Sequence, residues 1–215
     1  MPQSRRIGLM GGTFDPIHLG HLVTAEQARV DLALAEVVFI PAGGPWQKEG
    51  DVSDAEHRYL MTVLATAANP SFSVSRLELE TPGPTYTVDT LRRVRKALQE
   101  HGISQSREEL FFITGADAIL NILSWKDSEE CLELATFVAA TRPGHDLRDL
   151  EAHDLDHRVL HLNVPALAIS STDVRERFAA GRATRYLVPR EVEEYVHRHG
   201  LYGVAGHGLA AGSLP

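Results

Sequence analysis

The sequence predicts an α/β protein built around a parallel sheet, and three stretches carry this prediction. The apolar run 7–10 ends at two glycines and is typical of a buried first strand. A helix-compatible segment follows at 22–35, and a second apolar run at 37–40 ends at Pro41. A strand, a helix and a second strand in this order form a β-α-β unit, whose strands pair in parallel.

Alternating strand and helix patterns continue along the rest of the chain. Further strands are predicted at 72–75 with 77–80 as a continuation, from 109 to a glycine turn that ends at Asp117, at 136–141 and at 159–162. Further helices are predicted at 55–68 after the caps Ser53 and Asp54, at 87–100 with Thr87 as its cap, from 171 to near Gly181, and at 190–199. Within the first of these helices, His57 and Arg58 are expected to lie in solvent.

Composition narrows the class of protein. A chain of 215 residues with 43% hydrophobic content suits one domain, and its net charge of −8 argues against a general nucleic-acid binder. The single cysteine, Cys131, suits a reducing compartment and is expected as a small buried side chain. The sequence has no membrane-spanning apolar run and no signal-peptide pattern, so we expect a cytoplasmic protein without membrane or nucleic-acid partners.

The segment 11–21, Gly-Gly-Thr-Phe-Asp-Pro-Ile-His-Leu-Gly-His, is where the first strand passes into the first helix. Such junctions bind phosphates, because backbone N–H groups at a helix start face an anion. Gly11 and Gly12 allow close approach of a ligand, and Pro16 stiffens the loop. His18 and His21 are three residues apart, so a helical turn places them on one face.

The sequence His18-Leu19-Gly20-His21 resembles the HxGH signature of nucleotidyltransferases, and the whole 11–21 string resembles the first motif of bacterial nicotinate-nucleotide adenylyltransferases. The resemblance implies a Rossmann-like, doubly wound parallel sheet with a small C-terminal helical part at about 171–202. It covers a single nucleotidyltransferase domain, 1–202, and leaves 203–215 as a flexible tail. Gly20 is expected to leave room for a nucleotide against the backbone.

Two further strings extend the resemblance on the ATP side. Residues 169–175, Ile-Ser-Ser-Thr-Asp-Val-Arg, match the family motif that holds ATP phosphates. Gly115, Asp117 and the turn Arg142-Pro143-Gly144 occur between the two motifs in the order expected for the family. The ATP-binding residues implied in this way are Gly11, Gly12, Thr13, Phe14, His18, His21, Gly115, Asp117, Arg142, Ile169, Ser170, Ser171, Thr172 and Arg175.

On the substrate side, Thr85-Tyr86-Thr87 resembles the family segment that contacts the nicotinate nucleotide, and Trp125 matches the residue that stacks on its pyridine ring. Hydroxyl and N–H groups at a helix start suit the carboxylate of that ring. Lys48 matches a family lysine, although Trp46-Gln47 precede it where the family often has Pro-His. The implied nicotinate-nucleotide site comprises Asp15, Lys48, Thr85, Tyr86, Thr87 and Trp125.

The implied reaction joins ATP to nicotinate mononucleotide and releases deamido-NAD and pyrophosphate, a step of NAD biosynthesis. The substrate phosphate attacks the α-phosphorus of ATP directly, with His18, His21, Lys48 and Arg175 as the catalytic set. Mg²⁺ is expected on the ATP phosphates, with no protein ligands for a metal. The sequence leaves the oligomeric state open, a homodimer being one alternative.

Other interpretations remain open from the sequence. The acceptor substrate could instead be nicotinamide mononucleotide or phosphopantetheine, or the chain could be a non-catalytic nucleotide sensor. The histidine pair could be half of a zinc site, Lys48 a surface lysine and Trp125 a packing residue. The scattered histidines of 145–157 match no metal-ligand spacing and are interpreted as a solvated segment.

Overall fold

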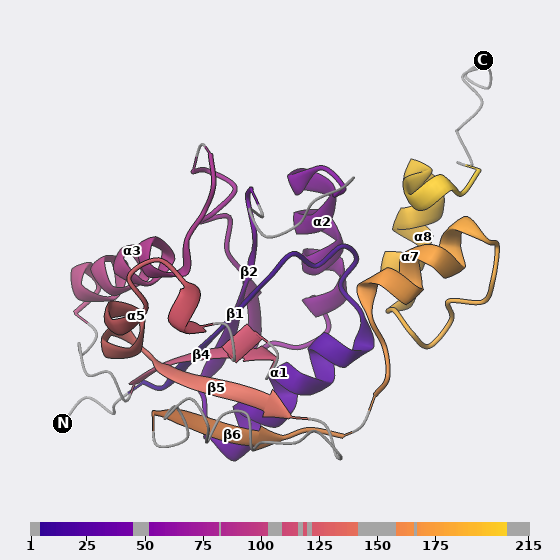
Figure 1. Cartoon of the computed structure of the whole chain (residues 1–215). Coiled ribbons are helices and arrows are strands. Elements are labelled where there is room, and N and C mark those ends of the chain that lie inside the picture. The colour runs from indigo at the N-terminus through magenta and orange to yellow at the C-terminus, as the bar shows by residue number, and fades with distance from the viewer. Residues whose placement is uncertain are drawn as a thin grey trace.

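One parallel sheet forms the centre of the molecule (Figure 1). The computed structural model describes residues 5–44, 52–81, 83–102, 109–115, 118–119, 122–141, 158–165 and 167–205. Its strands are β1 (Ile7–Gly12), β2 (Glu36–Pro41), β3 (Phe72–Val74), β4 (Leu110–Gly115), β5 (Thr136–Thr141) and β6 (Val159–Asn163). They pair in the order β3-β2-β1-β4-β5-β6, and each neighbouring pair is parallel, which confirms the predicted doubly wound α/β fold.

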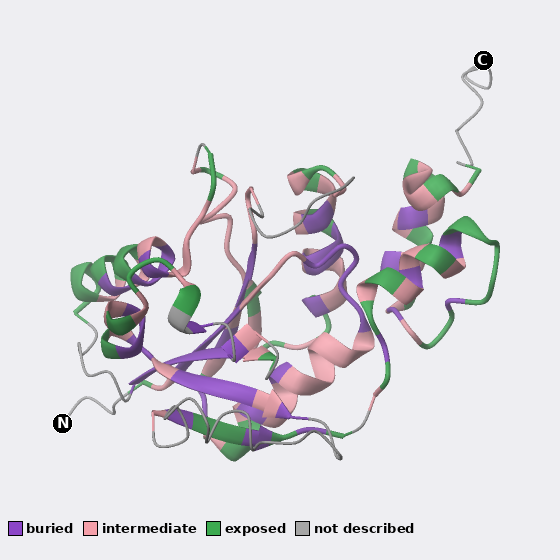
Figure 2. Cartoon of the chain, in the orientation of Figure 1, coloured by how far each residue is buried: buried purple, intermediate pink, exposed green. Residues whose placement is uncertain are grey.

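Helices cover both faces of this sheet. They are α1 (Leu19–Asp31), α2 (Ala55–Thr66), α3 (Thr87–Glu100), α5 (Ser128–Leu134), α7 (Ser171–Ala179) and α8 (Arg190–His199), with short 3₁₀ turns η2 (Ile122–Ser124) and η3 (Leu201–Gly203). Figure 2 shows the central strands mostly buried, β6 at the sheet edge largely exposed, and the outer helix faces exposed. Strands buried on both faces need nearly continuous apolar sequence, which explains why the strands could be predicted.

Successive strand residues alternate between two hydrophobic cores. Met10, Phe111 and Val138 pack with α1, α2, α7 and α8 on one face of the sheet. Leu9 and Phe112 pack with α3 and α5 on the other face. The second core also holds the thiol of Cys131, where burial raises the pKa to about 11, so the prediction of a small buried side chain is confirmed.

The C-terminal helices lie to one side of the sheet, next to α1 and α2 (Figure 1). Val174 and Phe178 of α7 and Val192 and Val196 of α8 are fully or almost fully buried there. The Tyr202 ring stacks on Phe178 with ring centroids 5.9 Å apart. The predicted C-terminal helices are confirmed, with α8 at the predicted bounds.

Three predictions about local structure were wrong. Helix α1 begins at Leu19 instead of 22, so it starts directly after His18. The 77–80 segment forms a turn, closed by backbone bonds such as Glu80 N–H to Arg76 O at 3.1 Å, and does not continue β3. Thr87 is the first residue of α3, while Tyr86 is its N-cap and makes no side-chain capping bond.

The side chain of Arg58 was predicted to lie in solvent, but it is 1% exposed. Its guanidinium donates to the carbonyl oxygens of Ser53 (2.9 Å), Thr13 (2.8 Å) and Gly43 (3.2 Å). Burial lowers the pKa of this arginine, since desolvation penalises the charged form. His57 is half-buried, with its Nδ1 2.8 Å from the Tyr195 hydroxyl.

Candidate functional site

The loop after β1 is built around a buried aromatic ring. Phe14 has a positive φ of 50° and is 2% exposed, and a cis peptide bond joins Asp15 to Pro16. A Cβ on Gly12 would lie 2.8 Å from the Phe14 ring, so glycine is required here by the loop itself. The Arg58 guanidinium donates a hydrogen bond to the carbonyl oxygen of Thr13 and thereby holds this loop in position.

The two histidines lie together at the start of α1. Their rings stack with centroids 3.7 Å apart, and Nδ1 of His21 accepts the backbone N–H of His18 at 3.2 Å. Because Nδ1 is the acceptor, the proton of a neutral His21 ring is on Nε2, which can donate to a ligand. The Phe14 ring meets His21 edge-on at 5.1 Å and limits its movement.

Gly20 lies directly against the ring of His18. A Cβ at this position would lie 3.0 Å from Nδ1 and 3.1 Å from Cε1 of His18. Glycine between the histidines therefore makes room for the His18 ring, which is 5% exposed.

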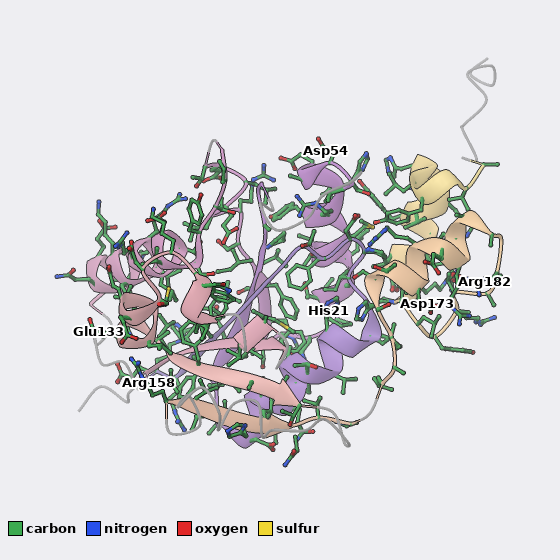
Figure 3. The ribbon with its side chains drawn as sticks, in the orientation of Figure 1. His21, Asp54, Glu133, Arg158, Asp173 and Arg182 are labelled. Atoms are coloured by element: carbon green, nitrogen blue, oxygen red, sulfur yellow. The ribbon has the colours of Figure 1, made fainter. Side chains whose placement is uncertain are left out.

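Helix α7 begins beside this loop (Figure 3). Ser170 is its N-cap and accepts the N–H of Asp173 at 3.1 Å, as the capping pattern predicted. The Ser171 hydroxyl donates to the Pro16 carbonyl (2.9 Å), 155 residues away in the chain. Ile169 is 6% exposed and anchors the segment in the core.

Arg175 joins the two motifs. Its Nη1 donates to the Asp15 carbonyl (2.7 Å), and its Nη2 donates to the Thr172 hydroxyl (3.3 Å). The guanidinium is only partly buried, so other edges of it can face an anion. The 11–21 and 169–175 segments thus form one surface that carries imidazole, guanidinium and helix N-terminal N–H groups.

The carboxylate of Asp15 points away from this surface. It is 2% exposed, and it accepts the Tyr202 hydroxyl at 2.7 Å and the Ser53 N–H at 3.3 Å. Burial and the neighbouring carboxylate raise the pKa of Tyr202. The structure therefore places Asp15 as a link to the C-terminal part, outside the set of residues that line the cavity.

A cavity of about 310 Å³ opens at the carboxyl ends of β1, β2 and β4. This is where the strand order reverses, between β1 and β4, which is the usual ligand position in an open parallel sheet. It is lined by Gly11, Gly12, Thr13, Ala42, Glu78, Thr85, Tyr86, Thr87, Phe112, Thr114, Ala118, Trp125 and Lys126.

Comparison with known proteins agrees with this geometry. The model of the cytidylyltransferase-like family matches residues 9–177. A relative from Clavibacter michiganensis, named probable nicotinate-nucleotide adenylyltransferase, is 56% identical over 92% of this chain and 94% of its own. The chain belongs to the nicotinate-nucleotide adenylyltransferase family. Another relative with this name, from Thermoanaerobacter, is 49% identical over 94% of this chain and 96% of its own.

A distantly related solved structure has the same fold as this chain. Nicotinic acid mononucleotide adenylyltransferase of Plasmodium falciparum, in complex with NaAD, superimposes with a TM-score of 0.73 at 20% identity. The alignment covers 94% of this chain and 98% of the other. The same enzyme in complex with APC gives a TM-score of 0.70.

In this member of the family, the cavity brings together Thr85–Thr87 and Trp125, the residues that the sequence predicts for the substrate side. The indole meets Phe112 and Phe137 edge-on, with centroids 6.4 and 6.3 Å away, so Trp125 both packs and lines the cavity. Nζ of Lys126 lies 4.8 Å above the Tyr86 ring. Sequence reasoning missed Lys126 and Glu78, although Lys126 directly follows a predicted site residue.

Other predicted residues lie elsewhere. Gly115 ends β4 and is exposed, and a Cβ there would meet nothing within 4 Å. Lys48, Asp117 and Arg142 lie outside the described residues, as do 145–157 and most of the predicted tail. Among the described residues, no group of three or more His, Cys, Asp or Glu side chains could hold a metal. In the same part of the chain, no helix combines the length and apolar character needed to cross a membrane.

Proposed function

We propose that this protein transfers AMP from ATP to nicotinate mononucleotide, which yields deamido-NAD and pyrophosphate. One observation carries the proposal: Ser171 and Arg175 of α7 bind the carbonyls of Pro16 and Asp15 in the loop that leads to His18 and His21. The two segments that resemble ATP-binding motifs are thereby one surface. The cavity lined by Thr85–Thr87 and Trp125 adjoins that surface through Gly11–Thr13.

On the ATP side, His18, His21 and Arg175 bind the phosphates together with N–H groups at the start of α7. The Nε2 proton of His21 is directed by the Nδ1 contact with the His18 backbone, so this imidazole donates to a phosphate oxygen. Ser170, Ser171 and Thr172 hold the start of α7 in position. Gly115 and Asp117 contact the adenosine, Arg142 contacts ATP, and Lys48 contacts phosphate, as the family resemblance implies.

On the acceptor side, the cavity holds the pyridine nucleotide. Its volume of about 310 Å³ falls within the usual range for small-molecule sites. Trp125 offers a ring face to the electron-poor pyridine, and the positive end of α3 faces its carboxylate. The hydroxyls and N–H groups of Thr85–Thr87 lie at that helix start.

Mg²⁺ accompanies the ATP phosphates in this proposal. The donors at the His18–Arg175 surface are N–H groups, which fit phosphate oxygens and do not fit a hard cation that prefers oxygen ligands. When bound, the ion would be held by phosphate and water oxygens and would supply charge neutralisation at the leaving pyrophosphate. The chain's own residues supply binding and orientation of the two substrates.

Catalysis proceeds without a covalent enzyme intermediate. A phosphate oxygen of nicotinate mononucleotide forms a bond to the α-phosphorus, and the bond from that phosphorus to the bridging oxygen of pyrophosphate breaks. Holding both substrates in line supplies much of the acceleration, and N–H donors stabilise the charge that develops. His18, His21, Arg175 and Lys48 are the residues we assign to this stabilisation.

The test is pyrophosphate release from ATP and Mg²⁺, with nicotinate mononucleotide and nicotinamide mononucleotide in parallel. We expect turnover with the acid at least about tenfold faster than with the amide, because one buried hydrogen-bonding group discriminates by this order or more. Release that is absent with both nucleotides would refute the proposal. Similar rates would replace it with a dual-specificity enzyme.

A further inference from the structure

Glu78 is a cavity residue whose carboxylate is fully engaged by threonines. Its Oε2 accepts the Thr85 hydroxyl and its Oε1 accepts the Thr90 hydroxyl, each at 2.6 Å. A carboxylate accepts hydrogen bonds and does not donate them, so both hydroxyl hydrogens point to Glu78. These bonds connect the 77–80 turn to both sides of the α3 N-terminus, since Thr85 precedes the helix and Thr90 lies within it.

The backbone of Glu78 is also fixed by its neighbours. A Cβ on Gly43 would lie 2.2 Å from the Glu78 carbonyl oxygen, so the chain after β2 lies directly against this turn. Gly44 approaches the carbonyl of Gly83 in the same way, at 2.9 Å. The buried side chain of Arg58 donates hydrogen bonds to the carbonyl oxygens of Gly43 and Thr13. Glu78 therefore lies at the junction of the β1 loop, the β2 loop and α3.

This arrangement limits what Thr85 can do for a ligand. Its hydroxyl hydrogen is directed to Glu78, so the side chain cannot at the same time donate to a substrate carboxylate. The donors that this side of the cavity can offer a ligand are backbone N–H groups at the start of α3, because the first turn of a helix has no intrahelical acceptors for them. Their direction depends on the conformation of 85–87, which the Glu78 bridge fixes.

We propose that Glu78 is a positioning residue for the pyridine nucleotide. Its carboxylate bridges Thr85 and Thr90, and so aims the N–H groups of the Thr85–Thr87 segment into the cavity. This inference rests on the proposed function for its choice of substrate. The bridge itself is a property of the protein alone, and can be measured without substrate.

The first test compares Glu78→Ala with Glu78→Gln. In the Gln variant one threonine donates to the amide oxygen and the other accepts from the amide N–H, so both bridges persist without the charge. We expect kcat/KM for nicotinate mononucleotide to fall about 100-fold in Glu78→Ala, mostly through KM, and only about threefold in Glu78→Gln. The KM for ATP is expected to stay within about threefold of wild type in both variants.

Glu80→Ala is the matched control, because Glu80 lies on the same turn, its side chain is exposed, and its carboxylate is 3.7 Å from the Arg76 guanidinium. Thr90→Val is the second variant: Thr90 is 4% exposed and outside the cavity lining, and its loss removes one bond of the bridge. We expect wild-type kinetics for the control, and a loss of about tenfold in kcat/KM for Thr90→Val.

The readout that needs no substrate is amide hydrogen exchange of the 83–91 peptide. Exchange is expected to accelerate in Glu78→Ala and Thr90→Val, and to stay as in wild type in Glu78→Gln and Glu80→Ala. Equal damage by the Ala and Gln variants would overturn positioning in favour of a charge effect. Unchanged exchange in Glu78→Ala would also overturn it. A wild-type protein without turnover would refute the proposed function, while the exchange result would still decide the role of Glu78.

Discussion

At the scale of single residues, His18 and His21 act as a stacked pair at the start of α1. We predict that His18→Ala lowers turnover by about 10³-fold, since loss of one donor to a developing charge costs this much. Steady-state kinetics measure the effect, and circular dichroism with thermal unfolding checks that the variant is folded. A loss below about tenfold in a folded variant would remove His18 from the catalytic set.

Gly20 allows activity and stability to be separated. Gly20 is in the first turn of α1, where alanine keeps part of its advantage over glycine of about 1 kcal/mol in a helix interior, so Gly20→Ala should not lower the melting temperature much. The new methyl would nevertheless lie 3.0 Å from Nδ1 of His18, and the ring must shift. We predict a fall in kcat of about 10- to 100-fold with a folded protein. Unchanged kcat would mean that the observed His18 position is not needed for the reaction.

At the scale of elements, α7 is fixed to the β1 loop through Arg175 and Ser171. We predict that Arg175→Ala raises the KM for ATP at least about tenfold, because it removes both a phosphate contact and the bond to the Asp15 carbonyl. Arg182→Ala is the control, as Arg182 is an exposed arginine just after the same helix. Equal kinetics for the two variants would contradict the role of Arg175.

The strands and helices could be predicted because their signals are local. Buried parallel strands such as β1 and β2 are short apolar runs in the sequence. Ser170 marks the start of α7, because its side chain forms the capping bond of that helix. The 77–80 segment was predicted as a strand because its alternating Leu and Glu residues are compatible with either a strand or a turn. Its actual turn depends on contacts with α3, which lies later in the chain.

The motif residues of the site could likewise be named from the sequence, but their partners could not. Arg58 lies on a helix with a polar neighbourhood, and nothing local distinguishes it from a surface arginine. Its burial follows from carbonyls of Thr13 and Gly43 that only the folded sheet brings together. Glu78 was missed for the same reason, because its two threonine partners define its role.

At the scale of the whole molecule, a buried polar contact connects the C-terminal end of the described chain to the β1 loop, in addition to the bonds made by α7. The Tyr202 hydroxyl donates to Asp15, whose carbonyl accepts Arg175. Asp15 thus links η3 to the proposed phosphate-binding surface. A change at Tyr202 is therefore expected to alter stability first, and ATP binding through the loop second.

The alkaline stability of the protein tests this contact. Burial, and then the Asp15 carboxylate, raise the pKa of Tyr202 in the folded state. The unfolded phenol ionises near pH 10, so the contribution of this group is complete below about pH 10 and is lost as pH rises towards the folded pKa. We predict that Tyr202→Phe lowers the free energy of unfolding by about 1.5–3 kcal/mol at neutral pH, the usual value for a hydrogen bond to a charged group.

The same variant should lose part of its alkaline sensitivity. Urea unfolding of wild type and Tyr202→Phe is compared at intervals between about pH 7 and 11. The difference in unfolding free energy should be constant at the lower pH values and shrink above about pH 10, because only the wild type must keep a phenol neutral. A difference that stays constant to the highest pH would show that Tyr202 ionises alike in both states. The contact with Asp15 would then not be what holds the C-terminal part against the site.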